Sequence, residues 1–179
     1  MAGDFRRPGR LRRSAETGDG RQLRRQGASL GGRRKRGERG QAIGRSRGGR
    51  TTKIHALVDG EGRPQAFLLT GGQVADIKGA ASLLAATGPA DHLLGDKAYD
   101  AGHLRQFLHC RGTIPVIPNK INRKSSFPFD AGLYRKRNII ERTFCRLKDF
   151  RAIATRYDKL ARNFLAALSL IATIIYWAD

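Results

Sequence analysis

The sequence has few acidic residues, few cysteines and no long apolar run, and each shortage excludes a class of protein. Its 179 residues contain 15 Asp and Glu against 35 Lys and Arg. Cys110 and Cys145 stand far apart, outside any Cys-x-x-Cys pair, which argues against a zinc site or a disulfide framework and fits the reducing cytoplasm. The C-terminal apolar run 164–177 has 14 residues, fewer than the ~20 that span a bilayer. We therefore interpret this run as a core helix and expect no membrane partner.

The excess of positive charge indicates a polyanionic partner. The formal net charge is +20, and residues 1–50 hold 16 Lys and Arg against 4 Asp and Glu. Nucleic acid is the first candidate for such a balance. Residues 1–40 are dominated by Arg and Gly and have neither a helical nor a strand period, so we predict a disordered arm there. A globular domain is predicted over 41–179.

Strands alternate with helices along this domain, which predicts an α/β sheet covered by helices on its faces. Asp76 and Asp100 stand at expected helix N-caps. The expected strands are 52–59, 64–71, 92–96 and 113–118, the first two forming a hairpin, and the expected helices are 76–88, 100–112, 132–150 and 160–177.

Asp96 follows the apolar run 92–95 and is the first candidate for chemistry. A carboxylate at the carboxyl end of a buried strand lies where α/β sheets bind ligands. The alternative is that Asp96 only caps the following helix, although Asp100 is the better candidate for that cap.

Tyr134, Arg137, Glu141 and Lys148, here called the helix stripe, fall on one side of the predicted helix 132–150 at ~100° per residue. Glu141 could simply form a surface pair with Arg137 four residues earlier. Such a pair does not explain why all four polar residues share one side, next to apolar neighbours. Two carboxylates on different elements of a basic domain instead suggest two-metal phosphoryl transfer.

The spacings Asp96-Lys97-Ala98-Tyr99 and Tyr134-x2-Arg137-x3-Glu141-x6-Lys148 resemble two motifs of DDE transposases from bacterial insertion sequences. The segments AIGRSRGGRTTKIHALVDGEGRP and IATRYDKLARNFLAALSLIA are also similar to this family. The resemblance covers about residues 41–179. It implies an RNase H-like fold, two Mg²⁺ or Mn²⁺ ions, and cutting and joining of double-stranded DNA at element ends and target by a homo-oligomer.

The same resemblance implies roles for individual residues. Asp96 and Glu141 would be the second and third metal-binding catalytic acids. The DNA-binding residues would be Tyr134, Arg137, Lys148, Arg142 and Lys97.

The first acid of the family has no counterpart, because the strand expected to carry it before 52–59 is missing. Asp4, Glu16, Asp19 and Glu38 lie in Gly/Arg-rich sequence, and we assign none of them the role. A one-nucleotide shift through codons 20–36 permits Asp-Gly-Ser-Tyr-Val-Gly-Lys-Ala-His-Arg-Ser-Ala-Ala-Gly-Gly-Lys-Gly, which resembles the family's first-acid segment. We therefore expect an arm read out of frame, a marginal core and a chain that is inactive alone.

Three hypotheses follow from these patterns: an inactive transposase domain, the C-terminal product of a two-frame element that acts as a frameshift fusion, and a non-catalytic basic nucleic-acid-binding protein. Lys120, Arg123 and Lys124 form a further basic loop that could contact phosphates or remain a solvated linker. His55 is expected in the core or in support of the site.

Overall fold

The computed structural model describes residues 13–16, 40–46 and 49–178. Within the predicted arm it places a strand, β1 (Arg13–Glu16), which pairs antiparallel with β3 (Gly49–Asp59). The expectation that no strand forms in residues 1–40 is therefore wrong at β1. Short runs lack a visible period, and pairing with a long central strand can order them. The rest of the arm lies outside the described residues.

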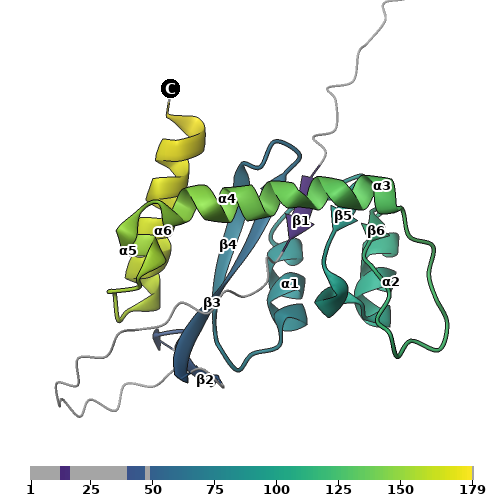
Figure 1. Cartoon of the computed structure of the whole chain (residues 1–179), viewed down its shortest axis with the longest axis horizontal. Helices are drawn as coiled ribbons and strands as arrows, with labels where there is room; N and C mark the ends of the chain where they lie inside the picture. Colours follow the sequence, from purple (N-terminus) through teal and green to yellow (C-terminus); the bar gives the residue numbers. More distant parts are fainter. Residues whose placement is uncertain (1–12, 17–39, 47–48, 179) are drawn as a thin grey trace, which may run out of the picture.

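Strand β3 is the centre of the main sheet (Figure 1). One edge of β3 pairs antiparallel with β4 (Pro64–Gly71), which confirms the predicted hairpin. The other edge pairs antiparallel with β1 at the end of β3. The short strand β2 (Gly44–Ser46) pairs antiparallel with the start of β3, next to the end of β4. Residues 51, 52 and 54–59 of β3 are buried, in keeping with its central place in the sheet.

A parallel pair continues the architecture beyond β1. Strand β5 (His92–Leu94) pairs parallel with β6 (Ile114–Val116), and β1 contacts β5. The helix α2 (Gly102–Cys110) connects β5 to β6, as a parallel pair requires. The predicted mixed α/β fold is confirmed.

Alternate residues of β3 pack on opposite sides of the sheet, as the period of a strand dictates. Leu57 packs in one cluster with α1 (Asp76–Ala85) and α2. Ile54, Ala56 and Val58 pack instead in two clusters with the C-terminal helices. The sheet is thus the middle layer between two groups of helices (Figure 1).

The predicted helix 132–150 is a run of three segments that crosses the sheet (Figure 1). The segments are α3 (Ala131–Tyr134), the 3₁₀ turn η3 (Arg135–Arg137) and α4 (Asn138–Lys148). Ile140 and Leu147 of α4 are buried, which confirms that one side of this helix faces the core. The short α5 (Arg151–Ala154) leads to α6 (Ala161–Trp177), the predicted C-terminal helix.

The hairpin turn fixes the position of α4. The hydroxyl of Thr143 donates to the carbonyl of Gly62 at 2.8 Å. Gly62 has a φ of +85°, and a Cβ there would lie 2.9 Å from the side chain of Ile139. Only glycine suits both the backbone and the close contact, so the turn and the helix are matched to each other.

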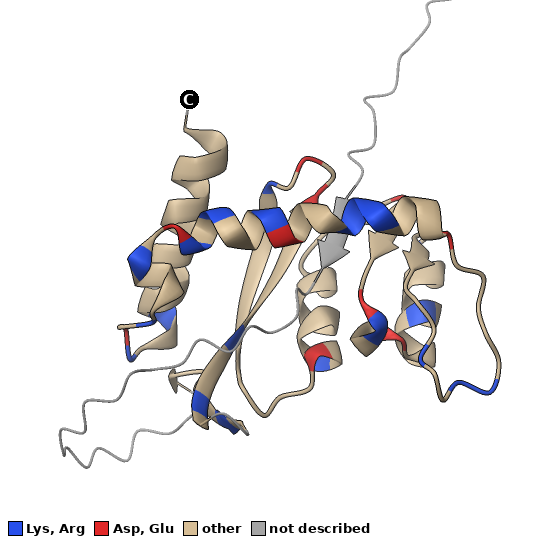
Figure 2. Ribbon diagram, viewed as in Figure 1, with Lys and Arg blue, Asp and Glu red and all other residues tan. Residues whose placement is uncertain are grey.

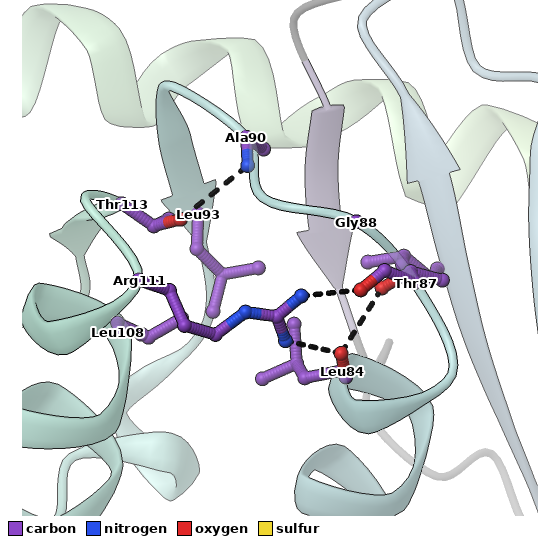
Figure 3. A pocket seen from close by; sticks show the side chains of 9 residues that line it. Leu84, Thr87, Gly88, Ala90, Leu93, Leu108, Arg111 and Thr113 are labelled. Atoms are coloured by element: carbon purple, nitrogen blue, oxygen red, sulfur yellow. Dashed lines mark hydrogen bonds between the residues drawn. The ribbon is translucent and has the colours of Figure 1, made fainter.

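Arg111 fastens the C-terminus of α1 to the end of α2 (Figure 3). Its guanidinium donates to the carbonyl of Leu84, in the last turn of α1, and to the carbonyl of Thr87 just beyond the helix. Thr113 accepts a hydrogen bond from the amide of Ala90 beside it. These contacts hold α1 and α2 together on one side of the sheet.

Both predicted aspartate caps are wrong. The N-cap residues of α1 and α2 are Ala75 and Ala101, and neither makes a side-chain cap. Asp76 forms an ion pair with Lys53 at 2.9 Å instead, and Asp100 is buried in a different network. In each case a cation from a distant segment binds the carboxylate more strongly than the helix amides could.

Candidate active site

Three residues of the helix stripe, Tyr134, Arg137 and Glu141, form a row of contacting groups. The guanidinium of Arg137 lies 5.5 Å from the ring centroid of Tyr134 and donates to Oε1 of Glu141 at 2.6 Å. The ring of Phe129 meets Tyr134 edge-on, with centroids 5.2 Å apart. Phenol, guanidinium and carboxylate therefore follow one another along the helix, as the spacing in the sequence predicted.

Glu141 is well placed to change partners. Its side chain is 53% exposed and that of Arg137 is 22% exposed. An exposed pair of this kind contributes about 0–1 kcal/mol to stability. Glu141 can therefore leave Arg137 for another cation at little cost.

The other three candidate DNA-binding residues lie on the same helix or on the turn of Asp96. Arg142 is exposed beside Glu141, and Lys148 is half-buried at the end of α4. Lys97 is exposed in the 3₁₀ turn η2 (Lys97–Tyr99). Figure 2 shows basic residues along η3 and α4 and on the loop that precedes α3.

Asp96 lies two residues beyond β5, as predicted, and it is half-buried. Its Oδ1 accepts a hydrogen bond from the amide of Ala98 at 2.7 Å, so Asp96 is the N-cap of η2. The capping role considered for it is confirmed, but it applies to a single 3₁₀ turn and not to α2. The bond fixes the carboxylate at the carboxyl end of its strand.

Sequence reasoning missed the network around Asp100, which ends the Asp96 turn (residues 95–100). Asp100 accepts from Nε of Arg105 at 2.9 Å, from Nε of Arg123 at 2.8 Å and from the amide of Lys120 at 2.8 Å. Burial opposes ionisation, yet the hydrogen bonds from Arg123, Lys120 and Arg105 outweigh it and lower the pKa of Asp100 to about 2. The available signal was Arg105, a charged residue on the same side of α2 as the apolar residues Leu104 and Leu108.

The prediction that His55 lies in the core is confirmed, because His55 is buried. Its Nε2 lies 2.7 Å from the hydroxyl of Thr70, and its ring packs against Gly79 of α1. Desolvation lowers its pKa, with opposing effects from Asp76, which raises it, and Lys53, which lowers it. His55 therefore supports the packing of α1 on β3.

Carboxylate oxygens of the kind supplied by Asp96 and Glu141 are the donors that Mg²⁺ and Mn²⁺ prefer. Among the described residues, however, no group of three His, Cys, Asp or Glu side chains could hold a metal ion. The described residues therefore contain suitable donors but not a complete site. In the same part of the chain, no helix is long and apolar enough to cross a membrane.

Comparison with known proteins identifies the family. The model of the transposase DDE domain matches residues 19–177. The chain belongs to the DDE transposase family. Its members are enzymes of DNA transposition that depend on divalent metals, so the resemblance found in the sequence is confirmed at this level.

Two relatives from insertion sequences agree with the family. A protein of Brucella ovis named as a transposase for insertion sequence element IS6501 is 38% identical over 129 residues, covering 70% of this chain and 98% of the relative. A protein of Burkholderia cepacia named as a transposase for element IS402 is 31% identical over 137 residues. That alignment covers 70% of this chain and 63% of the relative. No solved structure matches the chain.

Proposed function

We propose that this chain is the catalytic domain of an insertion-sequence transposase that binds double-stranded element ends, cuts the 3′ strand and joins it to target DNA. The observation that carries the proposal is the row of Tyr134, Arg137 and Glu141 on a helix packed against the sheet. Asp96, at the carboxyl end of β5, would complete the described part of the site.

Asp96 and Glu141 would be the metal-binding acids. Two Mg²⁺ or Mn²⁺ ions, when bound, would activate the attacking oxygen and stabilise the leaving oxygen. Glu141 would give up its bond to Arg137, which the exposure of the pair permits. Arg137 would then contact a DNA phosphate, together with Tyr134, Lys148, Arg142 and Lys97, and these contacts would fix the position of the strand.

We further propose an RNase H-like arrangement of the sheet. The antiparallel strands β4, β3 and β1 and the parallel pair β5 and β6 support it, as does the contact of β1 with β5. In this arrangement β1 would stand where the family carries its first acid. Active molecules would form a homo-oligomer, so that two element ends can be joined.

The chain alone would be inactive, since its first acid would be encoded in the neighbouring frame. The test compares the chain as it stands with a restored chain, in which residues 20–36 are replaced by the shifted-frame peptide. Mn²⁺-dependent cleavage of duplexes from the DNA that flanks the gene is the measurement. We expect the restored chain to cleave the duplexes and the unrestored chain not to. In the restored chain, Asp96→Ala and Glu141→Gln should each abolish cleavage.

Glu61→Gln is the matched control, because Glu61 is an exposed acid that pairs with an arginine of the hairpin turn, and it should leave cleavage unchanged. Cleavage by the unrestored chain would contradict its inactivity. Asp19→Asn would then be the next variant, because the family match begins at that residue.

Two alternatives remain distinct from this proposal. If the chain acts as part of a two-frame element, mass spectrometry of the host should detect a fused product. If it is a non-catalytic basic nucleic-acid-binding protein, Asp96→Asn and Glu141→Gln should leave every activity of the restored chain intact. Sequencing the gene region would decide whether the shifted frame encodes the first-acid segment.

A further inference from the structure

We propose that the loop between β6 and α3 inserts Ile121 as an apolar wedge between base pairs, from the minor groove of duplex DNA. Lys120 and Lys124 would contact the flanking phosphates. Residues 119–130 are called the basic loop below. The inference rests on the proposed DNA-binding function and adds to it a contact that none of the helix-stripe residues supplies.

Ile121 is the most exposed large apolar side chain among the described residues. Its side chain is 95% exposed and stands between Lys120 and the basic pair Arg123 and Lys124. Single exposed apolar residues are common on protein surfaces. The combination of an apolar tip and adjacent cations is the more specific feature, since it matches both the stacked bases and the phosphates of a duplex.

Hydrogen bonds between Asn119 and Phe127 close the base of the basic loop. The side-chain amide of Asn119 donates to the carbonyl of Phe127 at 3.0 Å and accepts from the amide of Phe127 at 3.0 Å. Within the tip, the amide of Arg123 donates to the carbonyl of Lys120 at 3.1 Å. A side chain that separates two stacked bases must be held by a rigid loop. The two hydrogen bonds between Asn119 and Phe127 supply such rigidity.

The buried carboxylate of Asp100 holds the basic loop against the rest of the domain. Arg123 and the amide of Lys120 both bind the carboxylate of Asp100. The guanidinium groups of Arg105 and Arg123 both contact the ring of Phe127, at 4.7 and 4.6 Å from its centroid. Arg123 is thus used inside the protein, and the ammonium groups of Lys120 and Lys124 form no ion pair within the described residues.

The basic loop is joined to both parts of the proposed site. Asp100 ends the turn that Asp96 begins, so the loop is held against that turn. At the other end of the loop, Asp130 accepts a hydrogen bond from the amide of Leu133 at 2.9 Å and so caps α3. Helix α3 begins the helical run that carries the helix stripe. DNA bound at Asp96 and Glu141 would therefore pass close to the loop.

Apolar side chains that open a base step from the minor groove, with basic residues beside them, are a general device for bending DNA. A loop that only contacted phosphates would need Lys120 and Lys124 but no isoleucine at its tip. The two arrangements differ in the stacking of the bases, which can be measured directly.

The test uses the full chain and duplexes from the DNA flanking the gene, with 2-aminopurine at successive positions. We expect binding of the unaltered chain to raise the fluorescence at one step, as that base unstacks. Ile121→Ala should remove this increase and weaken binding by about tenfold, the cost of one lost apolar contact. Ile121→Leu should retain both.

Two control variants separate the wedge from the phosphate contacts. Lys124→Gln should weaken binding and reduce the slope of log K against log salt by about one, while the fluorescence increase persists at saturation. Ile114→Ala, at an exposed residue of β6, should change neither quantity. Thermal unfolding of Ile121→Ala should match that of the unaltered chain, because the side chain is nearly fully exposed.

Equal affinity and equal fluorescence for the unaltered chain and Ile121→Ala would overturn the wedge and leave the proposed DNA binding intact. A chain that binds no duplex at all would overturn the proposed function and the wedge together.

Discussion

Two ion pairs between arginine and a carboxylate differ in almost every physical respect. Asp100 and Arg105 have side chains that are 0% and 2% exposed, in a network that also includes Arg123. Glu141 and Arg137 lie four residues apart on one helix, and Glu141 is 53% exposed. The first pair is isolated from water, whereas in the second the carboxylate is open to water and Arg137 is 22% exposed.

The difference in burial gives the two pairs different roles, because the first stabilises the fold and the second belongs to the candidate site. A buried charge that loses its partner cannot recover its hydration, so the Asp100 network must remain intact. An exposed pair gains little from its bond and can exchange it. The residues whose spacing identifies the family therefore include the weak pair Arg137 and Glu141, whose bond can be exchanged at little cost.

The largest effect should come from Asp100→Asn. The change leaves Arg105 buried without a charged partner, so we expect a loss of about 3–5 kcal/mol in the free energy of unfolding. Urea denaturation followed by circular dichroism would measure it. A loss below about 1 kcal/mol would show that the two pairs are alike, which would break the comparison.

The free energy of unfolding should depend on pH through the carboxyl group of Asp100. The pKa of Asp100 is lowered from 3.8 to about 2 in the folded state, so its stabilisation is complete above the unfolded pKa and is lost as the pH falls through 3.8 toward 2. The shift corresponds to roughly 2–3 kcal/mol. Urea denaturation at several values between pH 5 and pH 2 should show this loss, and Asp100→Asn should lack this part of it.

The two arginines of the network should differ from each other. Arg105→Gln removes a buried guanidinium that also donates to the carbonyl of Ile117 at 2.7 Å, so we expect a loss of about 2–3 kcal/mol. Arg123 is 18% exposed, and Arg123→Gln should cost about 1 kcal/mol. Equal losses in chemical denaturation would mean that burial does not set the strength of these bonds.

The smallest effect on stability should come from Glu141→Gln. We expect a change within about 1 kcal/mol, because the pair is exposed. In the restored chain the same change should abolish Mn²⁺-dependent cleavage. A large loss of stability would instead assign Glu141 to the fold, and it would weaken its proposed role in metal binding.

Much of the fold could be predicted from periodicity. The hairpin 52–71 and the C-terminal helix 160–177 agree with β3, β4 and α6, because alternation and apolar content are local properties of the chain. The row of Tyr134, Arg137 and Glu141 was predictable for the same reason, since helical geometry alone places residues at these spacings on one side.

The errors concern residues whose partners lie far away in sequence. Strand β1 has no period of its own, and its pairing with β3 orders it. Asp100 was expected to cap a helix, but Arg123 and the amide of Lys120 reach it from 23 and 20 residues away. Propensity cannot anticipate such contacts, because it depends only on neighbours in the chain.

The order of the main elements from β3 to α6, the helix stripe and the family could all be read from the sequence, because these depend on spacing within single segments. Which charges are buried, that β1 joins the sheet, and that the basic loop is held against the Asp96 turn became visible only in the folded molecule. Burial depends on what lies opposite a residue in space, and folding brings those partners together from distant parts of the chain.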